Sequence, residues 1–203
     1  MNYLAHVFLA EDNEESKLGN FLGDFVKGRL TNQYSAGIIK GIKMHRKVDV
    51  FTDSHKIVKN SRKLISPKRR RWAGAIIDIF FDHFLTVHWD KYSELKLDDF
   101  VLNFYDTLKK FNISVKNDLD FNFEKLIAND WMRKYENIDG LELVFSKLSN
   151  RVKTINPLTG SEQELINNYK DFENNFLIFF PQLIEHVEKI RNELKQNSIL
   201  IKF

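Results

Sequence analysis

Carboxylate, amide and imidazole side chains recur at intervals of four residues in the first half of the sequence. Residues four apart share one face of a helix, so each group would form a short polar stripe. The stripes are Asn2 and His6; Asn20 and Asp24; His45, Asp49 and Asp53; and Asp78 and Asp82. Taken alone, any one of them is most simply a solvated face or a hydrogen-bonded network in the core.

The pair Asp78 and Asp82 stands in a segment that is apolar on most sides, Asp78-Ile79-Phe80-Phe81-Asp82-His83-Phe84. Two carboxylates one helical turn apart repel each other unless a cation lies between them or one stays protonated. Oxygen ligands combined with imidazole suit Mn²⁺, Mg²⁺ or Fe²⁺. Such an ion activates water and holds a phosphate oxygen during in-line attack. The pattern therefore favours a divalent-metal site.

The sequence lacks the motifs of other common catalytic sites. The sequence has no cysteine, which excludes a thiol nucleophile, thiolate ligands and a disulfide framework. Gly19, Gly23 and Gly28 are wrongly spaced for a phosphate-binding loop, and no G-x-S-x-G motif occurs. His88 and His186 lie on helical stretches without clustered carboxylates, so we expect them to be structural or exposed.

Positive charge is concentrated in the first half. Residues 1–91 hold 16 Lys/Arg and 10 Asp/Glu, whereas the remainder holds 15 and 18. The run Lys68-Arg69-Arg70-Arg71 falls in the first turns of a predicted helix, where cations interact unfavourably with the helix dipole. It is either a solvated face or a docking patch for an acidic or phosphorylated partner, since arginine donors match carboxylate and phosphate groups.

The elements that carry these residues are predicted to be helices. Apolar residues recur at helical spacing after Gly19-Asn20 and again from Ile38 to Thr52. Ser66-Pro67 is typical of an N-cap followed by proline at the first helical position. The stretch that follows is apolar nearly all round, so we expect a buried central helix near 67–89.

The second half continues the helical pattern. Helices are predicted near 98–111, 121–135 and 139–152, followed by a long helical stretch to about residue 196. The pair Ser161 and Glu164 gives a capping-box pattern at the start of that stretch, and Pro181 is expected to kink it. The whole chain, 1–203, is predicted to be a single-domain all-α helical bundle, with the site motifs in 1–90 and helical completion in 91–203.

Composition also favours a cytoplasmic protein. The N-terminal segment lacks the basic stretch and long apolar run of a secretory signal. No apolar stretch approaches the ~18 residues that suggest a membrane span. The absence of cysteine fits a reducing compartment. We therefore expect no membrane partner.

Several of these segments, taken in order, resemble the acyl carrier protein phosphodiesterase family. The matching stretches are Asn2-Tyr3-Leu4-Ala5-His6, Gly19-Asn20-Phe21-Leu22-Gly23-Asp24-Phe25-Val26-Lys27-Gly28, Gly41-Ile42-Lys43-Met44-His45-Arg46, Asp49-Val50-Phe51-Thr52-Asp53-Ser54-His55, the basic run, and Asp78 to Leu85. The second half resembles the family more loosely.

The resemblance implies an α-helical fold distantly similar to HD-type phosphohydrolases and a divalent cation cofactor, preferably Mn²⁺. The implied reaction is hydrolysis of the phosphodiester that joins phosphopantetheine to a serine of holo acyl carrier protein. The products are the apo carrier and phosphopantetheine. The adjacent His-Asp signature of HD proteins is absent, since Asp82-His83 has the reverse order.

Residue roles follow from the stripes and the resemblance together. The predicted metal ligands are Asp24, His45, Asp78 and Asp82. The candidate catalytic imidazoles are His6 and His83, as further ligands or phosphate contacts, and His55, as a proton carrier. Asp49 and Asp53 are expected to orient the ligands. The predicted contacts with substrate or carrier are Arg69, Arg70, Arg71, Lys27 and Arg46.

Two other functions remain open from the sequence. The first is an HD-like phosphohydrolase with a small substrate such as a nucleotide. The second is a non-catalytic helical module that binds nucleic acid through the basic half. The second explains the arginines but leaves Asp78 and Asp82 unexplained, and the sequence has no recognisable nucleic-acid motif. We therefore expect no nucleic-acid partner.

Overall fold

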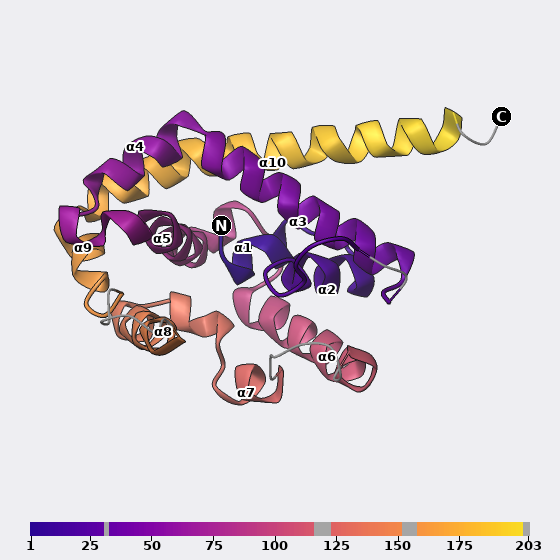
Figure 1. Ribbon diagram of the computed structural model, residues 1–203, viewed down its shortest axis with the longest axis horizontal. Helices are drawn as coiled ribbons and strands as arrows, with labels where there is room; N and C mark the ends of the chain where they lie inside the picture. The colour runs from indigo at the N-terminus through magenta and orange to yellow at the C-terminus, as the bar shows by residue number, and fades with distance from the viewer. Residues whose placement is uncertain (31–32, 116–122, 152–157, 201–203) are drawn as a thin grey trace.

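The protein is all-helical in the computed structural model, as predicted. The structure describes residues 1–30, 33–115, 123–151 and 158–200, with side chains omitted at 112–115, 151 and 194–200. Helices and turns make up these ranges, which contain no strand. Figure 1 shows α10 running beside α4 and α3, while α6, α7 and α8 lie on the opposite side of α5.

The first three helices bring together the N-terminal motifs. They are α1 (Tyr3–Phe8), α2 (Glu14–Leu22) and α3 (Ala36–Ser54). Polar side chains cap each start, because Asn2, Asn13 and Ser35 accept hydrogen bonds from the backbone N–H groups that open the helices.

Glycines let the backbones of α2 and α3 approach closely. A Cβ on Gly19 would lie 2.3 Å from the carbonyl oxygen of Ile38, and one on Gly41 would lie 2.7 Å from the carbonyl oxygen of Ser16. Larger residues at either position would force the helices apart. This crossing is what sets α3, with its polar stripe, against the end of α2.

A buried helix occupies the centre, as expected, but it is shorter than predicted. Residues Pro67–Trp72 form the 3₁₀ helix η1, and the α-helix α5 covers only Ala73–Val87. The preceding helix α4 covers Lys56–Leu64. Ser66 makes no side-chain cap at the start of η1; its hydroxyl and N–H instead donate to the Glu164 carboxylate.

The second half completes the core. Its elements are η2 (Trp89–Lys91), α6 (Leu97–Val115), α7 (Phe123–Ala128), η3 (Met132–Tyr135), α8 (Ile138–Arg151), α9 (Glu162–Asn167) and α10 (Tyr169–Leu200). Pro181 lies inside α10. One hydrophobic cluster extends from Met1 to Ile190, and phenylalanine rings of α5 and α10 pack at its centre, with Phe81 5.7 Å from Phe176 and 5.6 Å from Phe179.

Several predicted boundaries were wrong. Gly19-Asn20 does not start a helix, since α2 begins five residues earlier, at Glu14, and ends before Asp24. The stretch predicted at 121–135 divides into α7 and η3, while residues 116–122 and 152–157 lie outside the described ranges. Ser161 forms no capping box, because the Glu164 carboxylate binds Ser66 and Arg69 instead. The predicted long helix is also interrupted at Asn168, which separates α9 from α10.

Within the described ranges, every helix is too short or too polar to cross a lipid bilayer.

Candidate metal centre

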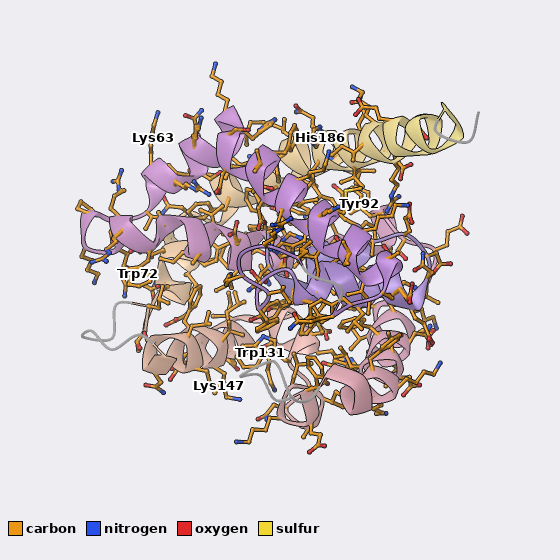
Figure 2. The ribbon with its side chains drawn as sticks, turned by 45° about the vertical axis from the view of Figure 1, so that its right-hand side comes forward. Lys63, Trp72, Tyr92, Trp131, Lys147 and His186 are labelled. Carbon is orange, nitrogen blue, oxygen red and sulfur yellow. The ribbon has the colours of Figure 1, made fainter. Side chains whose placement is uncertain are left out.

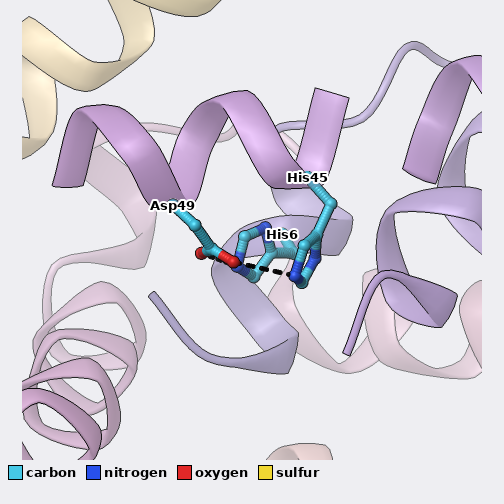
Figure 3. Close-up of side chains that lie close together, drawn as sticks. All are labelled: His6, His45 and Asp49. Carbon is cyan, nitrogen blue, oxygen red and sulfur yellow. Dashed lines mark ion pairs between the residues drawn. The ribbon is translucent and has the colours of Figure 1, made fainter. Parts of the chain in front are cut away.

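Two imidazoles and a carboxylate meet where α1 crosses α3. His6 Nε2 lies 3.1 Å from Asp49 Oδ1, and His45 Nε2 lies 3.0 Å from Asp49 Oδ2 (Figure 3). The two rings stack with centroids 3.7 Å apart. One ligand atom from each residue lies within 4.8 Å of the others, and among the described residues no other group of three His, Asp or Glu does so.

The hydrogen bond on the far side of His45 determines which nitrogen faces the cluster. His45 Nδ1 lies 2.7 Å from the carbonyl oxygen of Asn20, which only accepts, so Nδ1 carries the proton. In a neutral ring, Nε2 then presents a lone pair to the Asp49 carboxylate. Two acceptors at 3.0 Å require a proton or a cation between them. An N–H bond to a backbone carbonyl is also how metal-binding histidines are commonly oriented.

Packing holds His45 in this position. The ring is buried, and Gly23 at the end of α2 lies directly against it, because a Cβ there would be 2.2 Å from His45 Cγ. The α2–α3 crossing supplies the Asn20 carbonyl on the other side. The ring orientation therefore depends on both helices.

Burial and charge set the protonation of the neighbouring groups. Burial, together with the adjacent His45, lowers the pKa of His6 to about 3, so His6 is neutral near pH 7. Burial opposes ionisation of Asp49, but hydrogen bonds with His45 and His6 outweigh it and hold the pKa of this carboxyl below its usual range. The ionised carboxylate is the form that binds metals, whereas neutral His6 holds its proton on Nε2, which also lies 3.1 Å from the Met1 carbonyl oxygen, and would have to move it to the unpartnered Nδ1 to bind one.

Asp24 lines a surface hollow together with His45 and Asp49. Its Oδ1 lies 3.7 Å from His45 Nε2, and burial raises the pKa of its carboxyl. The hollow is about 250 Å³ and is also lined by Lys27 and Arg46. Arg46 Nη2 donates to the carbonyl oxygens of Val26 and Gly28, at 3.1 Å each, which ties α3 to the segment after α2.

The other two predicted ligands, Asp78 and Asp82, are not members of this group of three and contact the N-terminal segment instead. Asp78 Oδ1 is 2.9 Å from the Met1 amino group. The buried Asp82 accepts from the N–H groups of Asn2 at 3.1 Å and Leu4 at 2.8 Å, so it anchors the start of α1. Burial raises the pKa of Asp82 to about 7, although the Met1 ammonium and these N–H groups oppose the shift.

The remaining predicted catalytic imidazoles also lie outside the cluster. His55 caps α4, and its Nε2 lies 3.3 Å from Gln182 Oε1. His83 is buried against the second half, with Nδ1 2.7 Å from the Tyr135 carbonyl oxygen and Nε2 3.1 Å from the Tyr169 hydroxyl. Of the three candidate catalytic histidines, the structure places only His6 in the cluster.

The arginine run divides into two environments. Arg69 is nearly buried, with Nη1 3.0 Å from Glu164 Oε1 and Nη2 2.9 Å from the Thr159 carbonyl oxygen. Arg70 and Arg71 are exposed. They line a separate hollow of about 580 Å³ together with Arg62, Lys63, Asp53 and Asp78. Figure 2 shows Lys63 projecting outward from α4.

The sequence predicted an orienting role for Asp49, whereas in the structure its two oxygens contact the Nε2 atoms of both stacked imidazoles. The available signal was its position one turn after His45 on the same helix face. What the sequence could not show is that α1 places His6 against His45, within reach of the second oxygen of this carboxylate.

The fold and this site together define an all-helical protein with a candidate divalent-cation centre at a hollow that is lined by both carboxylates and cations. The chain belongs to the acyl carrier protein phosphodiesterase family, since the sequence model of that family matches residues 1–183.

Named relatives span nearly the whole chain. The chain is 34% identical to the acyl carrier protein phosphodiesterase of Photorhabdus laumondii, over 93% of this chain and 96% of the relative. It is 34% identical to that of Klebsiella pneumoniae and 30% identical to that of Escherichia coli, each over 93% of this chain and 98% of the relative. No solved structure matches, so the likeness to HD-type phosphohydrolases stays a prediction.

Proposed function

We propose that this protein is a divalent-metal-dependent phosphodiesterase that releases phosphopantetheine from holo acyl carrier protein. Family membership supports the substrate and the bond that is cleaved. The observation that carries the metal dependence is the arrangement at His45, where a fixed Nδ1–H leaves Nε2 facing a carboxylate.

The donor set fits a cation of the Mn²⁺ type. His6, His45 and Asp49 would hold the ion, with Asp24 as a fourth candidate, and Mg²⁺ or Fe²⁺ would suit the same mixed oxygen and imidazole ligands. When bound, such an ion supplies an activated water and charge neutralisation on a phosphate oxygen. Asp78 and Asp82 would act indirectly, by fixing the N-terminal segment that carries His6.

The cations around the hollow favour an anionic substrate. Lys27 is exposed at its rim, and the Arg46 guanidinium is held in place by two backbone carbonyls. A positioned guanidinium can contact phosphate oxygens without losing much side-chain entropy on binding. We assign these two residues to the phosphate of the substrate.

Carrier docking is assigned to Arg70 and Arg71. They are exposed beside Arg62 and Lys63 and form a basic surface that would complement an acidic partner. Arg69 belongs to the same run, but its ion pair with Glu164 gives it a structural task. Of the three arginines predicted to dock the carrier, we therefore assign only Arg70 and Arg71 to that role.

The test is incubation of purified protein with holo acyl carrier protein and Mn²⁺, followed by mass spectrometry of the carrier. We expect a mass loss equal to phosphopantetheine that a chelator abolishes and Mn²⁺ restores. A well-folded protein that leaves the carrier intact in Mn²⁺, Mg²⁺ and Fe²⁺ would refute the proposal. Cleavage of nucleotides under the same conditions would then favour a small-substrate phosphohydrolase.

A further inference from the structure

A second, more apolar hollow lies between α3 and α10. It measures about 560 Å³ and lies within the ~300–1,000 Å³ range of ligand sites. Its apolar wall consists of Val50, Phe51 and Ile190, and Lys47 and Lys189 stand at its edges. Figure 2 labels His186, which contributes to the groove from α10. We call this hollow the α3–α10 groove.

The groove has a preformed aromatic wall, and charged side chains, Arg46, Lys47, Lys189 and Glu193, stand round it. The His186 and Phe51 rings stack with centroids 4.1 Å apart and an interplanar angle of 13°. Burial lowers the pKa of His186, and the charges of Lys189 and Lys47 lower it further, so the ring is neutral near pH 7. Val50, by contrast, is 70% exposed although it is apolar. Val50 together with Phe51 and Ile190 gives the groove an apolar lining, as ligand sites commonly have.

The α3–α10 groove adjoins the candidate metal centre. Arg46 lines both hollows. On α3, successive residues turn by about 100°, so Arg46 and Val50 lie next to Asp49 round the helix, whereas Phe51 lies on the opposite side, roughly 200° from Asp49. A ligand whose phosphate lies beside Arg46 could therefore extend into the groove without leaving the surface of α3.

The chemistry of the substrate distinguishes the two hollows that flank the centre. The phosphodiester joins a carrier protein to a pantetheine chain, which is neutral and carries two amides and a geminal dimethyl group. The hollow at Arg70 and Arg71 is strongly basic and suits an acidic protein surface. The α3–α10 groove also carries charged side chains, but it differs in presenting Val50, Phe51 and Ile190, which suit the methyl groups of a chain whose amides can bond to the polar residues around them.

We propose that the α3–α10 groove binds the pantetheine arm of the substrate, with Arg46 at the junction between arm and phosphate. This inference rests on the proposed function. It predicts that pantetheine adds affinity beyond that of a phosphate group alone, and that this gain depends on Val50.

The test compares binding of free phosphopantetheine and of methyl phosphate in the presence of Mn²⁺, using Val50→Glu to place charge and bulk in the groove. Val50 is exposed and glutamate is a good helix former, so the fold should be retained. The matched control is Leu143→Glu on α8, since Leu143 is also an exposed aliphatic residue, at 51%.

We expect the wild type to bind phosphopantetheine at least tenfold more tightly than methyl phosphate. Val50→Glu should remove most of that difference and raise KM for holo carrier, without changing Mn²⁺ affinity, while Leu143→Glu should resemble the wild type. Equal binding of phosphopantetheine by wild type and Val50→Glu, with holo carrier still cleaved, overturns the groove assignment alone. Failure of the wild type to cleave holo carrier overturns the proposed function and this inference with it.

Discussion

At the scale of single residues, the site depends on which atoms of His45 and Asp49 face each other. The Asn20 carbonyl oxygen fixes the proton of His45 on Nδ1. The two oxygens of the Asp49 carboxylate contact the Nε2 atoms of His6 and His45. The carboxylate therefore links His6 to His45. Removing its charge affects both imidazoles at once.

Asp49→Asn should weaken Mn²⁺ binding by more than tenfold and abolish phosphodiester hydrolysis, because a neutral amide is a poor substitute for an anionic ligand. Titration calorimetry would measure the affinity, and circular dichroism would show the helices intact. Asp53→Asn is the matched control, since Asp53 is one turn further along α3 and pairs with Arg62 instead. Undiminished Mn²⁺ binding by Asp49→Asn would remove this residue from the ligand set.

Asp82 should make a distinct contribution to the pH dependence of stability. Its pKa is about 7 in the folded protein, against about 3.9 in an unfolded chain. The folded state therefore holds the extra proton between pH 4 and 7, and this group stabilises the fold at low pH and loses that effect as pH rises through 7. The slope is at most about 1.4 kcal/mol per pH unit.

Asp82→Asn removes this titration, so its destabilisation relative to wild type should be largest near pH 5 and smaller at pH 8. Urea unfolding at both pH values measures the difference. The comparison between variant and wild type is needed because His6, with its pKa lowered to about 3, gives the opposite trend between pH 3 and 6.5. A difference that is the same at pH 5 and pH 8 would show that Asp82 does not titrate in this range.

At the scale of elements, the close contact of α2 with His45 on α3 can be tested at Gly23. Gly23 has φ −53° and ψ −33°, which alanine also adopts, so a substitution acts through space rather than through the backbone. The added Cβ would overlap the buried His45 ring. Gly23→Ala should therefore weaken Mn²⁺ binding by roughly tenfold to a hundredfold with little loss of helicity.

Gly74→Ala provides the control for this experiment. A Cβ on Gly74 meets nothing closer than Arg62 Nη2 at 3.5 Å, an ordinary contact. Its Mn²⁺ affinity should equal that of the wild type, as measured by the same titration. If Gly23→Ala also binds Mn²⁺ normally, the His45 ring is not held by α2.

A second inter-element contact joins η1 to α9. Glu164 accepts from the Ser66 N–H at 3.1 Å, from the Ser66 hydroxyl and from Arg69. Glu164→Ala leaves these donors without their acceptor, which should cost about 1–3 kcal/mol of unfolding free energy. Chemical denaturation measures this, with Glu185→Ala as control, because the pair of Glu185 with Lys189 is exposed to solvent and should contribute little to stability. Equal losses for the two variants would contradict this role.

The Glu164 contact also illustrates what the sequence could and could not predict. Helical periodicity predicted α3 and a buried α5 correctly, because their apolar faces are read from local spacing. The capping box at Ser161 and Glu164 was wrong because a distant Ser66 competes for the same carboxylate. His45 and Asp49 were one turn apart in sequence, but their meeting with His6 depends on a helix crossing that no local pattern encodes.

At the scale of the whole molecule, α3 connects three hollows of different chemistry. His45 and Asp49 face the candidate metal centre, Asp53 borders the basic hollow with Arg70 and Arg71, and Val50 and Phe51 line the α3–α10 groove. A phosphodiester flanked by an acidic protein and a neutral chain could use all three. Because the residues assigned to carrier docking differ from those assigned to the metal, a substitution can change the affinity for the carrier without changing the affinity for the metal.

Replacing both Arg70 and Arg71 with glutamine should therefore raise KM for holo carrier several-fold at low salt, with kcat and Mn²⁺ affinity unchanged. The cause is the loss of long-range attraction to an acidic partner, so the salt dependence of KM should weaken as well. Steady-state kinetics at low and at physiological ionic strength would measure both effects.

The matched control replaces Lys96 and Lys109 with glutamine. These are two exposed cations on or next to α6, which lies away from α4 and α5 (Figure 1). That variant loses the same net charge but none of the basic hollow, so its KM should stay close to that of the wild type. An equal rise in KM for both variants would mean that overall charge, and not the surface at Arg70 and Arg71, attracts the carrier.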